Sequence, residues 1–171
     1  MAKKILFLSK NIYSVLHENL KKHSNNEIFY TSYKHLTFDL KKSDVKIFDT
    51  RNGLFLEDYD LVYFKQYNIE TSACVVYLLE KKISFLNKDL ANNFIYNKLA
   101  QYVKLGLNDF NIPDSFYGSN KQLMIAAKDM QFPIILKGIQ TSLGKDNFLI
   151  KSIEELEIVL EQNKKSNFVI Q

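Results

Sequence analysis

Strand-like and helix-like stretches alternate along the first half of the sequence, and this alternation limits the fold more than any other feature. Residues 5–8 and 61–64 are short, continuous apolar runs, which is the pattern of strands buried on both faces of a sheet. Apolar residues at helical spacing follow the first run, residues 70–82 predict a second helix, and residues 83–86 predict a closing strand. Because strands that alternate with helices form parallel sheets, we predict an α/β fold with a doubly wound, mostly parallel sheet over residues 1–88.

The second half of the chain has a different pattern. Residues 96–107 predict an amphipathic helix, and two capping boxes, at Ser119 and Ser152, each introduce a further helix. Strands are predicted at residues 134–136, 147–150 and 168–170, the first two forming an antiparallel pair joined by a long loop. We therefore predict a small α+β unit with an antiparallel sheet over residues 89–171, packed against the first unit.

Composition fits an ordered protein. The 171 residues are 46% hydrophobic and include 13 Phe and 10 Tyr, far more than a disordered chain would contain. The single cysteine, Cys74, excludes an internal disulfide, as expected of a cytoplasmic protein, and we interpret it as a core residue. No apolar run approaches the ~18 residues of a membrane span. The net charge of +4 comes from lysines scattered among acidic residues, so the sequence predicts neither a membrane nor a nucleic-acid partner.

The most informative segment surrounds Lys137. This lysine ends an apolar strand and precedes a polar loop with Gly144 near its tip. A lysine together with exposed backbone N–H groups can neutralise and hold phosphate oxygens. The loop is neither a P-loop nor a dinucleotide-binding fingerprint, because the required lysine and glycine spacings are missing. Taken alone, the segment fits a hairpin with a lysine at its edge equally well.

The order of several short motifs resembles the ATP-grasp superfamily, in particular the glutathione synthetase and RimK-like ligases. The motifs are Asn97-Lys98-Leu99, the segment 112–115, the strand with Lys137, the Gly144 loop and the strand that ends at Gln171. The resemblance covers nearly the whole chain. It implies a Rossmann-like preATP-grasp domain at residues 1–88 and an N-terminal ATP-grasp nucleotide-binding subdomain at 89–171, and we expect the C-terminal catalytic subdomain to be absent from this chain.

By the same resemblance, the residues that contact ATP are Lys98, Lys137, Thr141, Ser142, Gly144, Lys145 and Gln171. Thr141 and Asp146 stand where the relatives often have glycine, which leaves closure of the loop over ATP in question. Lys65 follows the strand at residues 61–64, and there it either binds the carboxylate of an acceptor substrate or is an ordinary solvated lysine. No catalytic residue or metal ligand is assigned; the Mg²⁺ ligands are expected beyond residue 171.

The implied function is ATP binding within an ATP-dependent carboxylate–amine ligase that acts through an acylphosphate. Its partners would be ATP with Mg²⁺ and small-molecule or peptide carboxylate and amine substrates, and a homo-oligomer is left open. Whether the protein is an enzyme stays open too, and we expect this chain alone to be inactive. The alternative is a degenerate or truncated ATP-grasp module that binds nucleotide or a partner without catalysis. The three histidines, His17, His23 and His35, lack metal-ligand spacing and are interpreted as surface or hydrogen-bonded residues.

Overall fold

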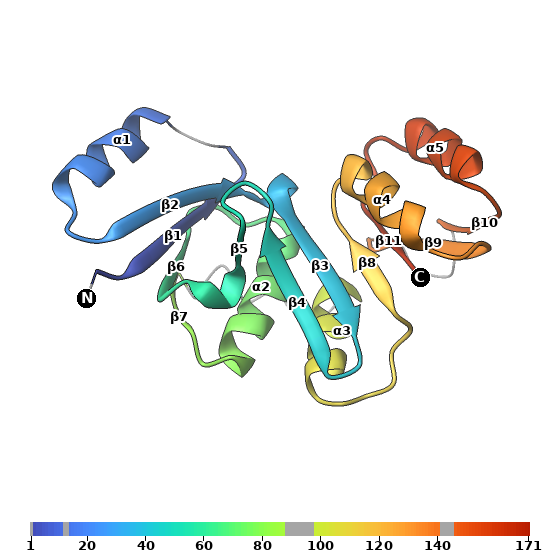
Figure 1. Ribbon diagram of the computed structural model, residues 1–171, viewed down its shortest axis with the longest axis horizontal. Helices are drawn as coiled ribbons and strands as arrows, with labels where there is room; N and C mark the ends of the chain where they lie inside the picture. The colour runs from blue at the N-terminus through green and yellow to red at the C-terminus, as the bar shows by residue number, and fades with distance from the viewer. Residues whose placement is uncertain (1, 12–13, 88–97, 141–145) are drawn as a thin grey trace.

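The computed structural model describes residues 2–11, 14–87, 98–140 and 146–171. A four-stranded parallel sheet has the order β2-β1-β6-β7 and lies at one end of the molecule (Figure 1). Its strands are β1 (Lys4–Ser9), β2 (Glu27–Ser32), β6 (Leu61–Phe64) and β7 (Ser84–Leu86), and its helices are α1 (Ser14–His23) and α2 (Ile69–Glu80). The predicted parallel sheet of an α/β fold is confirmed.

The second sheet has seven strands in the order β10-β9-β11-β8-β3-β4-β5, and all of its pairings are antiparallel. The strands are β3 (Leu36–Lys41), β4 (Asp44–Asp49), β5 (Leu54–Phe55), β8 (Ser115–Tyr117), β9 (Ile134–Gly138), β10 (Asn147–Ile150) and β11 (Phe168–Ile170). Its helices are α3 (Lys98–Leu107), α4 (Asn120–Ala126) and α5 (Ile153–Gln162), and the short 3₁₀ turns are η1 (Tyr33–His35), η2 (Leu56–Asp58) and η5 (Ala127–Asp129). The predicted antiparallel sheet in an α/β fold is therefore present.

The antiparallel sheet extends across the predicted boundary at residue 88. Its β3 strand comes from the first half of the chain and pairs with β8 from the second half, with Phe38 opposite Tyr117. Figure 1 shows β3 and β4 in the middle of the molecule, between the parallel sheet and the lobe that contains α4 and α5. The division into residues 1–88 and 89–171 stays a prediction, and the sheet joins the two parts through backbone hydrogen bonds.

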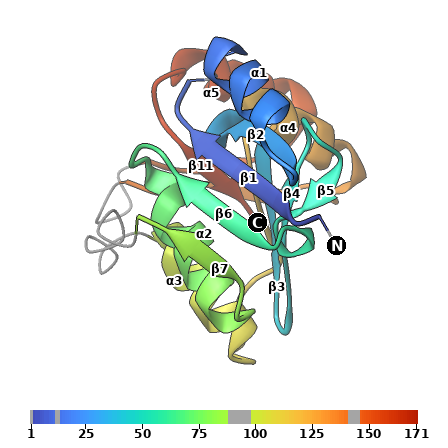
Figure 2. The same cartoon turned by 90° about the vertical axis from the view of Figure 1, so that its left-hand side faces the viewer.

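Two hydrophobic cores hold these layers together. The larger core surrounds α2 and α3, which pack side by side (Figure 2), and includes Cys74, which is fully buried as predicted. The smaller core lies between α4, α5 and one face of β9, β10 and β11. Ser119 and Ser152 begin α4 and α5 as predicted: the Ser119 N–H donates to Gln122 Oε1 (2.7 Å), and Ser152 Oγ accepts from the Glu155 N–H (3.3 Å). Among the described residues, no helix is long and apolar enough to cross a membrane.

Candidate functional site

Lys137 projects from the face of the antiparallel sheet opposite α4 and α5. Its neighbour Leu136 is buried in the smaller core, whereas Lys137 is only partly buried. Because successive side chains of a strand point to opposite faces, Lys137 lies on the face of the sheet that points away from the smaller core. The pairing places Lys137 opposite Val169 of β11, and Val169 opposite Tyr117 of β8. The backbones of Lys137 and Tyr117 are therefore about 10 Å apart, which is two strand spacings.

Lys98 reaches the same end of β9 from a different element. It is the first residue of α3, and its Nζ donates a hydrogen bond of 3.0 Å to the carbonyl oxygen of Gly138, the residue after Lys137. The contact of Lys98 with the residue next to Lys137 gives the two lysines a common location.

The other predicted ATP contacts divide into two groups. Thr141, Ser142, Gly144 and Lys145 lie outside the described residues. At the base of their loop, the Gly138 N–H donates to the carbonyl oxygen of Asp146 (2.8 Å). Gln171 continues the pairing of β11, since its backbone exchanges hydrogen bonds of 2.9 and 3.0 Å with Ile135, and its Nε2 donates to Ser115 Oγ (2.9 Å). By strand alternation Gln171 lies on the same sheet face as Lys137.

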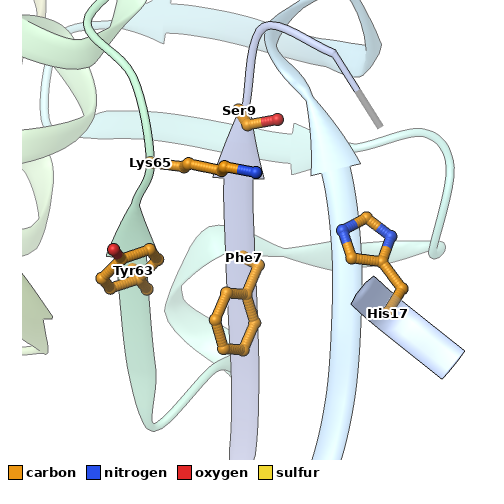
Figure 3. Close-up of a pocket in the computed structure, with 5 residues that line it drawn as sticks. All are labelled: Phe7, Ser9, His17, Tyr63 and Lys65. Carbon is orange, nitrogen blue, oxygen red and sulfur yellow. The ribbon is translucent and has the colours of Figure 1, made fainter. Parts of the chain in front are cut away.

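Lys65 lies in a separate pocket on the parallel sheet. The pocket has a volume of about 160 Å³ and is lined by Phe7, Ser9, His17, Tyr63 and Lys65 (Figure 3). Ser9 and Lys65 lie at the carboxyl ends of β1 and β6, which are neighbours in the sheet. From these two strands the chain continues in opposite directions, from β1 to β2 on one side and from β6 to β7 on the other. This is the switch point at which open α/β sheets bind ligands. Ser9 and His17 were not predicted as site residues; the position of Ser9 at the carboxyl end of β1 was the available signal.

Aromatic rings form the floor of this pocket, and polar groups lie at its end. The Phe7 ring lies 5.2 Å from that of Tyr63 and 5.4 Å from that of Tyr30. Figure 3 shows the Lys65 ammonium group above the Phe7 ring, next to Ser9, with His17 facing them from α1. An aromatic floor with an ammonium group at one end suits a small organic molecule that carries a carboxylate or another anion.

His17 is buried, with 8% of its surface exposed, and its ring stacks on Tyr30. Burial, followed by the positive charges of Lys65, Arg51 and Lys21, lowers the pKa of His17 from 6.5 to about 4. His17 is therefore neutral at pH 7 and leaves Lys65 as the cationic group among the pocket-lining residues. His17 is thus buried rather than at the surface, and it lines the pocket.

Replacing Lys65 with Met should raise the pKa of His17, because a nearby positive charge that opposes protonation is removed. NMR titration of the His17 ring in the two proteins measures the change. Lys22→Met, an exposed position on the same helix, is the control and should leave the titration unchanged.

The wild-type protein should lose stability as the pH drops from about 6.5 to about 4, because the unfolded chain binds a proton at His17 at a higher pH than the folded chain does. A wild-type pKa near 6.5 would contradict the buried position.

A metal ion is held by clustered His, Cys, Asp or Glu side chains, whereas the phosphates of a nucleotide are held by cationic hydrogen-bond donors. Among these residues, no group of three or more His, Cys, Asp or Glu side chains is arranged to hold a metal ion. A Mg²⁺ site is therefore not assigned to them. The ammonium groups of Lys98 and Lys137 suit phosphate oxygens, which accept charge-assisted hydrogen bonds from such donors.

Comparisons with known proteins are informative only at the level of structure. The sequence matches no family model and no curated protein. A RimK domain protein ATP-grasp from Sphaerobacter thermophilus matches 98% of this chain at 13% identity and a TM-score of 0.41. N5-carboxyaminoimidazole synthetase from Staphylococcus aureus, complexed with ADP, matches 99% at 12% identity and a TM-score of 0.41. D-alanyl-alanine synthetase A from Vibrio cholerae matches 99% at 11% identity and a TM-score of 0.35.

The chain spans 62%, 47% and 59% of the lengths of these three proteins, respectively. Such similarity describes the arrangement of helices and strands, and it assigns neither a substrate nor a catalytic residue. In its fold, the chain resembles the ATP-grasp ligases over nearly its whole length.

Proposed function

We propose that the chain is the ATP-binding portion of a ligase that joins a carboxylate to an amine. The observation that carries the proposal is the hydrogen bond from Lys98 to Gly138, which brings the two lysines of the sequence motifs to the same end of β9. The loop between Gly138 and Asp146 begins at this point. Two ammonium groups at the entrance of a loop provide charge and donors for the phosphates of a nucleotide.

The proposed reaction has two steps. A carboxylate oxygen of the first substrate attacks the γ-phosphorus of ATP, which forms an acylphosphate and releases ADP. The amine of the second substrate then attacks the acyl carbon, inorganic phosphate leaves, and the amine nitrogen loses a proton. Mg²⁺, when bound to the nucleotide, would supply further positive charge to the phosphates. The role of Lys98 and Lys137 is to hold the phosphates in place and to offset the charge that develops on them.

Lys65 is the proposed contact for a substrate carboxylate. Its pocket combines an ammonium group with an aromatic floor at the carboxyl ends of β1 and β6. The neutral state of His17 at pH 7 makes Lys65 the cationic side chain among the residues that line this pocket. The pocket thus has the chemistry for the organic acid, while the lysines at the end of β9 have the chemistry for the nucleotide.

Calorimetric titration with ATP, ADP and AMP tests the nucleotide assignment. We expect ATP and ADP to bind at least about tenfold more tightly than AMP, because a charge-assisted hydrogen bond contributes about 1.5–3 kcal/mol and AMP lacks the β-phosphate. Equal affinities for the three nucleotides, or no binding of ATP, would contradict the proposal. Because this chain alone is expected to be inactive, trapping with hydroxylamine over a panel of carboxylates should yield no acylphosphate, and a trapped product would contradict that expectation.

A further inference from the structure

A second cavity, of about 290 Å³, lies where the first turn of α2 meets the end of β8 and the segment before β11. Its walls include Lys34, Glu70, Tyr117, Ser119, Lys164 and Asn167. None of the residues that line the Lys65 pocket lines this one. We call it the Glu70 pocket. Since a water molecule occupies about 30 Å³ of liquid, the cavity has room for a small organic molecule.

Glu70 is the unusual residue of this pocket. Only 6% of its surface is exposed. Tyr117 Oη donates a hydrogen bond of 2.6 Å to Glu70 Oε1, whereas Glu70 Oε2 is buried and meets no donor within the described part of the chain. Burial raises the pKa of the Glu70 carboxyl group. A buried polar atom without a partner is unfavourable, so the environment of Oε2 favours an additional hydrogen-bond donor.

Three hydroxyl groups close to Glu70, those of Thr71, Tyr33 and Ser119, donate to other acceptors. Thr71 Oγ1 donates to Tyr33 Oη (2.7 Å), and Tyr33 Oη donates to the carbonyl oxygen of Gln66 (2.7 Å). The hydroxyl of Ser119 donates to Gln122 Oε1 (2.8 Å). Glu70 lines the pocket, so a molecule that enters it can bring a donor to this carboxyl group.

The charges around the pocket indicate the chemistry of that molecule. A primary ammonium group offers three donors and a positive charge, and thus matches a buried carboxylate better than any neutral donor. Two exposed lysines also line the cavity: Lys34, and Lys164, which forms an ion pair of 2.6 Å with Glu161. A ligand that is cationic at one end and anionic at the other meets an opposite charge at both ends.

We propose that the Glu70 pocket binds a small zwitterion, with its ammonium group on Glu70 and its carboxylate near Lys34. This inference goes beyond the proposed nucleotide function and does not depend on it. The pocket lies beside the end of β9, since Asn167 of its wall accepts a hydrogen bond from the Ile139 N–H (3.0 Å) and donates from its side chain to Gln140 (3.3 Å). The two sites nevertheless use different residues.

Three matched probes test the proposal: 4-aminobutyrate, butylammonium and butyrate. Chemical-shift titration of the backbone amides of Ser119 and Asn167 reports binding at the pocket. We expect 4-aminobutyrate to bind more tightly than butylammonium, and butyrate to bind least. Glu70→Gln should weaken both ammonium probes about tenfold or more, because their charged partner is replaced by an amide.

Two lysine variants separate the ends of the ligand. Lys34→Ala should weaken 4-aminobutyrate and leave butylammonium unchanged, whereas Lys121→Ala, an exposed lysine outside the pocket, should change neither. Lys137→Met should also change neither, which distinguishes this site from the proposed nucleotide site. If butyrate binds as tightly as butylammonium, or if Glu70→Gln binds all probes like the wild type, the proposal is wrong. Should Glu70→Gln fail to fold, the ranking of the three probes on the wild type still decides.

Discussion

Replacing Lys137 with Met should weaken ATP binding by about tenfold or more, since one charge-assisted hydrogen bond to a phosphate contributes about 1.5–3 kcal/mol. Met keeps most of the length and the apolar part of the side chain, so the strand pairings of β9 should survive. Lys98→Met should weaken ATP binding to a similar extent, and it also removes the hydrogen bond to Gly138. Calorimetric titration of ATP into each variant measures both effects.

The affinity for AMP provides an internal reference for these variants. Loss of a contact to the β- or γ-phosphate should leave AMP binding nearly unchanged, whereas a general distortion of the site should weaken all nucleotides together. Lys151→Met, at an exposed position that follows β10, is the matched control and should bind ATP like the wild type. If both Lys98→Met and Lys137→Met also bind ATP like the wild type, their proposed roles are wrong.

Local patterns predicted most of the individual elements. The apolar runs of β1 and β6, the helical spacing in α2 and the antiparallel pair β9–β10 depend on residues that are close together in the sequence. The burial of α2 around most of its circumference followed from its uninterrupted apolar stretch. Such features can be predicted because the periodicity of apolar residues directly reflects which face of an element is covered.

The position of β3 was not predicted, although its sequence carried a signal. Leu36, Phe38 and Leu40 alternate with polar residues, which is typical of a strand with one covered face. No local pattern indicates that Phe38 pairs with Tyr117, because the partner of a strand is set by contacts between distant parts of the chain. This pairing carries the antiparallel sheet across the predicted boundary at residue 88.

The two pockets show the same limit of sequence analysis. A glutamate in the first turn of a helix is an ordinary favourable choice, so the sequence did not single out Glu70. Its burial depends on Tyr117, which comes from β8 in the other half of the chain. Lys65 was predicted from its position after a strand, but its companions Ser9 and His17 come from the two elements of the first βα unit.

Asp49→Ala should destabilise the protein by about 3–5 kcal/mol, the loss expected when a buried, hydrogen-bonded charge network loses its acceptor. Asp49 lies at the end of β4 and is fully buried. Its carboxylate accepts hydrogen bonds from Thr31 Oγ1 (2.7 Å), Asn52 Nδ2 (2.6 Å), Tyr59 Oη (3.1 Å) and the Arg51 N–H (3.0 Å). Because Thr31 belongs to β2, this carboxylate links the parallel sheet to the antiparallel sheet.

Urea denaturation of the variant and the wild type measures this loss of stability. Asp44→Ala is the matched control: Asp44 begins the same strand, is exposed and pairs with Lys46 at 3.0 Å, so its replacement should cost no more than about 1 kcal/mol. Asp49→Asn should fall between the two, because the amide keeps one acceptor oxygen but turns two N–H donors toward groups that are themselves donors. If Asp49→Ala is as stable as Asp44→Ala, Asp49 does not connect the two sheets. A loss of several kcal/mol would instead support the role of this buried carboxylate in joining β2 of the parallel sheet to β4 of the antiparallel sheet.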